Sequence, residues 1–215
     1  MQAFFESWYG QLITAAAAIL LILAGIGVSR SRSGEGSHKG TRMLVFSAVM
    51  VAVATVLSFV KILKMPQGGS VTLFSMLPIT LIGYIYGPAQ GILCGMAYGL
   101  IQLILGPWVI SPVQLLVDYP LAFGALGLSG FFWKRQDGML TGYAVGCLGR
   151  LIMSGISGVV FFSEYAAEWN MNPLAYSFAY NIAYIGAEAL VTIVVFMAVT
   201  PVKQSLERIK TMARA

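Results

Sequence analysis

The chain has 215 residues, of which 58% are hydrophobic and only 10% are charged, and its mean hydropathy is +0.82. Soluble domains carry about 25% charged residues, so this composition excludes a soluble domain and indicates a polytopic membrane protein. The net charge of +5 does not indicate a nucleic-acid partner, because the basic residues stand in short flanks between apolar runs, as the positive-inside rule describes.

The first predicted element is a membrane span over residues 9–28, which has the roughly 20 apolar residues that a span needs. The preceding residues include Glu6 and no Lys or Arg, whereas a cleaved signal peptide begins with a positively charged region. We therefore expect residues 1–28 to hold an uncleaved N-terminal transmembrane helix.

A polar, basic linker over residues 29–42 follows this span. It contains the chain's single histidine, His38, which we expect to be solvated rather than to bind a metal. Lys39 precedes Gly40 instead of following it, so the linker is not a phosphate-binding loop, and no Walker A motif occurs elsewhere.

Six further apolar segments predict an all-α membrane domain over residues 43–200, followed by a basic cytoplasmic tail at 201–215. The predicted spans are 43–63, 71–87, 90–106, 113–133, 139–162 and 175–200. With seven spans in all, ten of the 13 basic residues fall on one side of the membrane, namely Arg30, Arg32, Lys39, Arg42, Lys134, Arg135, Lys203, Arg208, Lys210 and Arg214. The positive-inside rule then places the N-terminus outside and the C-terminus in the cytoplasm.

Small residues recur every four positions within several spans, as in Gly91, Gly95 and Gly99 and again in Gly142 and Gly146. Such faces let helix backbones approach closely in lipid, so we interpret them as internal packing surfaces. Ala48 and Ala52, with Ala54, form a similar face that either packs inside the bundle or meets another subunit.

One acidic residue, Asp118, interrupts the helix that begins near Pro112. A carboxylate inside a span costs roughly 2.5–3.5 kcal/mol, so we expect Asp118 to face a cavity or the protein interior. Gln114 lies four residues earlier on the same helix face, and Trp108 and Tyr119 are close in sequence. An acid, an amide and aromatic rings together indicate a pocket for an organic cation.

Arg150 and Glu188 are the other charges predicted at membrane depth. One interpretation is a buried ion pair of Arg150 with Asp118 or Glu188, because buried charges need partners. The alternative is a substrate site in which Arg150 steers the acids or the ligand. Both interpretations stay open at this point.

The last span begins with aromatic and amide residues. Tyr176 fits either an interfacial aromatic belt or a ligand contact, whereas Asn181, about one turn into the span, needs a polar partner that a ligand can supply. The loop over residues 64–72 contains Gly68 and Gly69 and is either a mobile flap over a pocket or a plain connecting turn.

Four segments together resemble the thiamine-specific substrate-binding (S) component of energy-coupling factor (ECF) transporters. The similarity extends over about residues 43–200, and the segments are Met65–Leu73, Val113–Phe123, Gly155–Phe162 and Met171–Ser177 with Asn181. The resemblance implies a six-helix vitamin-binding bundle, here with one extra N-terminal transmembrane helix. It also implies docking of the chain, which carries no ATPase, onto a membrane coupling subunit and two cytoplasmic ATPases.

The resemblance also assigns residues to these roles. In the family an alanine-rich face meets the coupling subunit, and Ala48 and Ala52 stand at that place. Together with Gln114, which shares the helix face of Asp118, the positions that the resemblance implies give the predicted substrate-binding residues Trp108, Gln114, Asp118, Tyr119, Arg150, Ser154, Phe162, Tyr176 and Asn181. This chain departs from the family at Ser154, where some members have histidine, at Phe162, where some have tryptophan, and in its extra first span.

The principal hypothesis is therefore a thiamine-binding transport subunit in a bacterial cell membrane. The alternatives are an S component for another small vitamin or a thiamine precursor, and a stand-alone transporter that couples to protons through Asp118 and Glu188. No inverted repeat, which would favour the second alternative, is visible. An enzyme is not expected, and no metal or cofactor is expected either, because Cys94 and Cys147 lie inside apolar runs without metal-ligand spacing.

Overall fold

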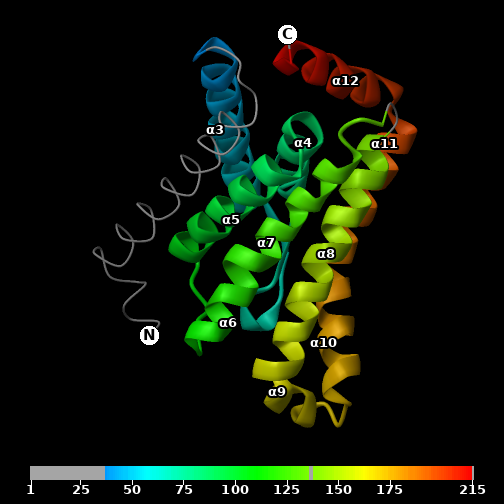
Figure 1. Ribbon diagram of the computed structural model, residues 1–215. Coiled ribbons are helices and arrows are strands. Elements are labelled where there is room, and N and C mark those ends of the chain that lie inside the picture. Colours follow the sequence, from blue (N-terminus) through cyan, green and yellow to red (C-terminus); the bar gives the residue numbers. More distant parts are fainter. Residues whose placement is uncertain (1–36, 136–137, 215) are drawn as a thin grey trace.

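The computed structural model describes residues 37–135 and 138–214, which form a bundle of helices with one short β-hairpin (Figure 1). The predicted span at 9–28 and residues 29–36 of the linker lie outside the described residues. The elements are α3 (Ser37–Phe59), β1 (Lys61–Lys64), η1 (Pro66–Gly68), β2 (Ser70–Thr72), α4 (Met76–Tyr86), α5 (Pro88–Leu105), α6 (Pro112–Leu116), η2 (Val117–Leu121), α7 (Ala122–Gly124), η3 (Ala125–Phe132), α8 (Gly138–Phe161), α9 (Ser163–Glu168), α10 (Pro173–Asn181), η4 (Ile182–Gly186), α11 (Ala187–Ala198) and α12 (Thr200–Arg214).

Five helical segments of the described chain are long and apolar enough to cross a membrane, which confirms a polytopic all-α membrane protein. They are Gly40–Phe59, Pro88–Leu105, Pro112–Phe132, Gly138–Phe161 and Pro173–Ala198. The predicted span at 71–87 is wrong in length, because its helix α4 has only 11 residues. At a rise of 1.5 Å per residue, α4 covers about half of the roughly 30 Å hydrocarbon core.

The residues that precede this short helix form a β-hairpin. Strands β1 and β2 pair antiparallel, with Lys61 opposite Thr72 and Lys64 opposite Ser70. Residues 61–63, which we predicted inside a helical span, are therefore extended. All four β1 residues are exposed, so their apolar side chains contribute no core contact that would favour a helix, and Pro66 with the glycines that follow favours a turn.

The glycine faces pack inside the bundle, as predicted. A Cβ atom added to Gly91 of α5 would lie 2.6 Å from Cα of Gly83 on α4, and one added to Gly146 of α8 would lie 2.7 Å from the carbonyl oxygen of Leu126 on η3. No real Cβ approaches other atoms this closely, so α4, α5, η3 and α8 reach their observed separations only with glycine at these positions.

The helix that carries Asp118 changes its winding around Pro120. Residues Val117–Leu121 form a π-helical turn between two α-helical segments. A proline inside a helix lacks the N–H of the regular bond, and its ring crowds the carbonyl four residues earlier. A π turn is a common way for a helix to absorb such a disturbance, and it is frequent at functional sites.

Helix α12 lies across the end of the bundle at which α3 begins, and α9 lies toward the opposite end (Figure 1). We call these the α12 end and the hairpin end, since the β-hairpin follows the far end of α3. The residues that we predicted only as a basic tail at 201–215 are thus mostly helical.

Candidate functional site

A cavity opens among α5, the α6–η2 segment, α8, α10 and the hairpin, with an empty volume of about 1250 Å³ including its opening to solvent. All nine residues predicted for the substrate site line this cavity, namely Trp108, Gln114, Asp118, Tyr119, Arg150, Ser154, Phe162, Tyr176 and Asn181.

Two of these residues position the loop that follows α5. The Tyr119 hydroxyl accepts a hydrogen bond from the backbone N–H of Trp108 at 2.8 Å and donates one to the Gly106 carbonyl at 3.3 Å. The Gln114 amide nitrogen donates to the Trp108 carbonyl at 3.0 Å. Both polar groups already bind the protein, so Tyr119 and Gln114 hold Trp108 in place and have little hydrogen-bonding capacity left for a ligand.

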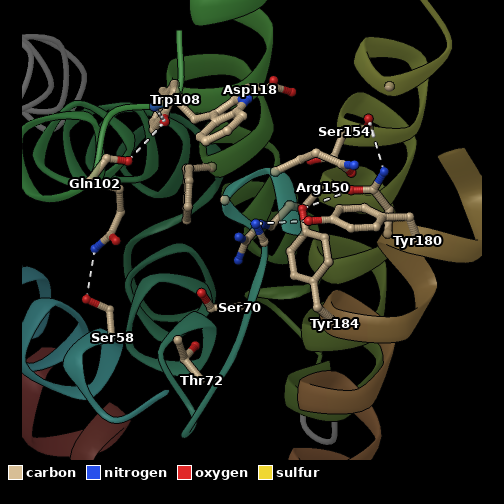
Figure 2. Close-up of a pocket in the computed structure, with 18 of the residues that line it drawn as sticks. Ser58, Ser70, Thr72, Gln102, Trp108, Asp118, Arg150, Ser154, Tyr180 and Tyr184 are labelled. Atoms are coloured by element: carbon tan, nitrogen blue, oxygen red, sulfur yellow. Dashed lines mark hydrogen bonds between the residues drawn. The ribbon is translucent and has the colours of Figure 1, made fainter. Parts of the chain in front are cut away.

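Asp118 lies at the π turn beside this loop. Its Oδ2 atom accepts a hydrogen bond from Nε2 of Gln114 at 2.6 Å. The Trp108 indole nitrogen is buried and lacks a hydrogen-bond partner among the described residues. Figure 2 shows Trp108 and Asp118 in the wall of the cavity.

The buried ion pair, one of the two interpretations left open by the sequence, is wrong. Among residues 37–135 and 138–214, Arg150 forms no ion pair with either acid. Its guanidinium instead lies 4.1 Å from the centroid of the Phe123 ring, and its Nε atom has no hydrogen-bond partner there. A cation over an aromatic face is stabilised by the ring quadrupole, so Arg150 is held in the cavity wall by Phe123 and not by an ion pair.

The carboxylate of Glu188 is hydrogen-bonded within the protein. Its carboxylate accepts hydrogen bonds from the hydroxyl of Thr72 at 2.5 Å, the hydroxyl of Ser75 at 3.1 Å and the backbone N–H of Met76 at 3.0 Å. Met76 begins α4, whose first N–H groups have no partner within the helix. Glu188 therefore caps α4 and ties it to β2 and α11, which leaves the carboxylate no role in the cavity.

Asn181 does not need a ligand to satisfy its amide, contrary to our expectation. Its Nδ2 donates to the carbonyl oxygens of Ser177 at 2.9 Å and Ser154 at 3.3 Å. Its Oδ1 accepts from the hydroxyl of Tyr184 at 2.9 Å. Asn181 thus joins α8 to α10 at the cavity wall and orients Tyr184.

The glycine loop is more than a connecting turn, because two tyrosines of α10 hold it against the cavity. The Tyr180 hydroxyl accepts from the backbone N–H of Gly69 at 3.1 Å and also donates to the carbonyl of Pro66. The Tyr176 hydroxyl donates to Oε1 of Gln67 at 3.2 Å. Gln67 and Gly68 adopt positive φ angles of 58° and 87°, so the loop forms a tight cover attached at three points.

One side of the cavity was not predicted. Ser58, Ser70, Thr72 and Gln102 form a polar wall away from Asp118 (Figure 2), and the Gln102 amide donates to the Ser58 hydroxyl at 3.1 Å. Single hydroxyl and amide residues in apolar helices give little sequence signal. Tyr180 and Tyr184 also line the cavity. The available indication was that Tyr176, Tyr180 and Tyr184 follow one another at intervals of four residues.

The comparisons with known proteins agree with this architecture. Residues 44–208 match the model of the family described as "Thiamine transporter protein". The chain belongs to this family. The match confirms the family that the sequence segments indicated, and with the apolar helices it establishes a multi-pass membrane protein.

Two curated relatives and one solved structure are similar to the chain. Thiamine transporter ThiT of Bacillus subtilis is 36% identical over 159 residues, which are 66% of this chain and 81% of the relative. ThiT of Lacticaseibacillus paracasei is 27% identical over 186 residues, 77% of this chain and 88% of the relative. A structure of ThiT from Listeria monocytogenes superposes with a TM-score of 0.57 at 24% identity, covering 80% of this chain and 93% of that chain. At that identity the structural similarity shows the fold alone.

Proposed function

We propose that the cavity binds thiamine and that the chain is the S component of an ECF-type vitamin transporter, a binding subunit rather than an enzyme. The observation that carries the proposal is the environment of Asp118. Its carboxylate lines the cavity, accepts a hydrogen bond from Gln114 and forms no ion pair with Arg150 among the described residues. An unpaired acid of this kind suits a cationic ligand that also donates hydrogen bonds.

Thiamine has both properties, since it carries a permanently charged thiazolium ring and an aminopyrimidine. In the proposed complex Asp118 accepts a hydrogen bond from the ligand or pairs with its charge. Trp108, Phe162 and Tyr176 offer aromatic faces, and a cation over such a face gains roughly 0.5–2 kcal/mol. Gln114, Tyr119 and Asn181 act by positioning their neighbours, because their polar groups are engaged within the protein.

The proposal includes docking to a membrane coupling subunit and, through it, to two cytoplasmic ATPases. Ala48 and Ala52 are exposed on α3, whereas Ala54 is fully buried on the opposite side of the same helix. An exposed face of small residues within a span permits close approach of another helix. This exposure favours the subunit-contact alternative for Ala48 and Ala52 over internal packing.

We further propose that the α12 end faces the cytoplasm. The exposed basic residues Arg42, Lys134, Arg135 and Arg208 gather there, as the positive-inside rule requires. The loop over 65–69, which covers the cavity, then faces outward. A stand-alone proton-coupled transporter is less well supported, because one of its two candidate acids, Glu188, is fully engaged in capping α4.

The test is equilibrium binding to the purified full-length protein in detergent, with thiamine, its phosphate esters, its pyrimidine half and unrelated vitamins as ligands. Tight binding of thiamine over the unrelated vitamins is expected, with weaker binding by the Tyr176→Ala variant, which loses an aromatic face. A preference for the pyrimidine half would favour a precursor transporter. No binding of thiamine would refute the proposed substrate.

A further inference from the structure

One side of helix α12 packs on the bundle. Leu206 packs on the buried cluster of Leu81, Tyr84, Met139 and Phe196. The Tyr84 hydroxyl lies 3.1 Å from Oε1 of Glu207, and Nζ of Lys210 lies 3.7 Å from the centroid of the Tyr84 ring. The bundle therefore covers Leu206 on the apolar side of this amphipathic helix, whereas Met212 stays exposed.

The contacts of α12 also bring separate basic segments together. The same Tyr84 hydroxyl lies 3.1 Å from the carbonyl of Arg135, so the loop after η3 adjoins α12. At the other end of α12, the Ala213 carbonyl accepts a hydrogen bond from Tyr86 at 3.3 Å. The Tyr86 ring in turn packs edge-on against Phe46 of α3, with centroids 5.7 Å apart. Helix α12 thus reaches from the Arg135 loop to α3, near Arg42.

The outward side of this assembly is cationic. Four basic residues are exposed there, namely Arg42, Lys134, Arg135 and Arg208. Among the described residues of the α12 end, Glu207 is the one acidic residue. We define these four basic residues as the cationic rim. Lys134 also lies over the Trp133 ring, 5.5 Å from its centroid, and tryptophan beside basic residues is typical of the headgroup level of a membrane.

We propose that the cationic rim binds the headgroups of anionic phospholipids, with α12 lying in the membrane interface. In Figure 1 α12 runs across the membrane-crossing helices rather than along them, which places it parallel to the bilayer surface. The exposed basic side chains attract phosphate, whereas Leu206 packs on the bundle. An amphipathic helix at an interface gains from anionic lipid in this way. This inference is independent of the proposed substrate.

The experiment compares the full-length protein in nanodiscs of zwitterionic lipid alone and of zwitterionic lipid with phosphatidylglycerol. The midpoint of thermal unfolding is measured in both, at low and high salt. Each basic side chain that contacts a headgroup is worth a rise of about 2–4 °C in a protein of this size. High salt should remove the rise, because it shortens the screening length.

Arg208→Gln is the test variant, and Arg135→Gln/Arg208→Gln doubles the effect. Lys64→Gln is the matched control, since it removes one charge from the exposed strand at the hairpin end. We expect the phosphatidylglycerol-dependent rise to shrink in the α12-end variants and to persist in Lys64→Gln. Phosphatidylglycerol retained by each variant in native mass spectrometry gives a second readout that does not depend on stability.

Three results would overturn the proposal. The first is a parent protein that is insensitive to phosphatidylglycerol in both readouts. The second is an equal loss in Lys64→Gln and Arg208→Gln, which would mean a general charge effect. The third is unchanged retention of phosphatidylglycerol by Arg135→Gln/Arg208→Gln. If the same variant also lost vitamin uptake in cells, the cationic rim would be assigned to the coupling subunit instead.

Discussion

Asp118→Asn tests the binding site most directly, because it keeps the shape of the side chain and removes its charge. Gln114 donates to Oδ2 at 2.6 Å, and an asparagine can still accept that bond through its own oxygen. Its NH₂ group then faces the cavity, where a ligand donor or cation would meet a donor instead of an anion. A hydrogen bond to a charged group is worth about 1.5–3 kcal/mol, so thiamine affinity should fall by about ten- to 150-fold.

Glu188→Gln is the matched control, since it makes the same chemical change in a buried acid. That carboxylate binds Thr72, Ser75 and the first N–H of α4, so its loss should act on folding. Weakening this cap by about 1–3 kcal/mol lowers the unfolding midpoint by roughly 2–12 °C. We expect Glu188→Gln to lose stability with a smaller change in affinity, and Asp118→Asn to show the reverse.

The assay is titration of detergent-purified variants with thiamine, with folding checked by size exclusion and by the unfolding midpoint. A folded Asp118→Asn variant with the parent's affinity would remove Asp118 from the site. Equal losses of affinity in both variants would show that charge anywhere near the cavity matters, rather than contact with Asp118.

Three other predictions concern docking, the loop cover and orientation. Ala52→Trp should abolish uptake in cells and leave thiamine affinity unchanged, because it blocks helix approach at an exposed face; lost affinity would instead place that face inside the bundle. Gly69→Ala should speed thiamine dissociation about fivefold, since the added Cβ lies 2.5 Å from the Tyr180 hydroxyl and overpacking costs about 1 kcal/mol; adding Tyr180→Phe should restore part of the loss, and no restoration would argue against this contact. In a cysteine-free background, an impermeant thiol reagent should label Ser163→Cys and not Ser33→Cys in intact cells; the opposite pattern would reverse the orientation.

Local composition was sufficient to predict the class of the protein and much of its outline. Hydropathy is a property of short segments, so the six apolar runs after residue 43 correspond to six helical segments, with errors at the ends. The glycine spacing on α5 and α8 predicted internal packing for the same reason, since every fourth residue shares a helix face. The nine predicted site residues came from an acid at membrane depth and from family resemblance, and all of them line the cavity.

The tertiary structure determined which groups are hydrogen-bonded to one another. Glu188 caps α4 through residues 112 to 116 positions away, and Tyr180 holds Gly69 across 111 positions. No local pattern specifies such pairs, because they depend on how distant helices pack. The same limit explains why the sequence left an Arg150 ion pair open and why the partners of Asn181 were missed. Sequence periodicity determined which residues face inward, whereas the packing of α4, α8, α10 and α11 determined which of them bind the protein and which remain free for a ligand.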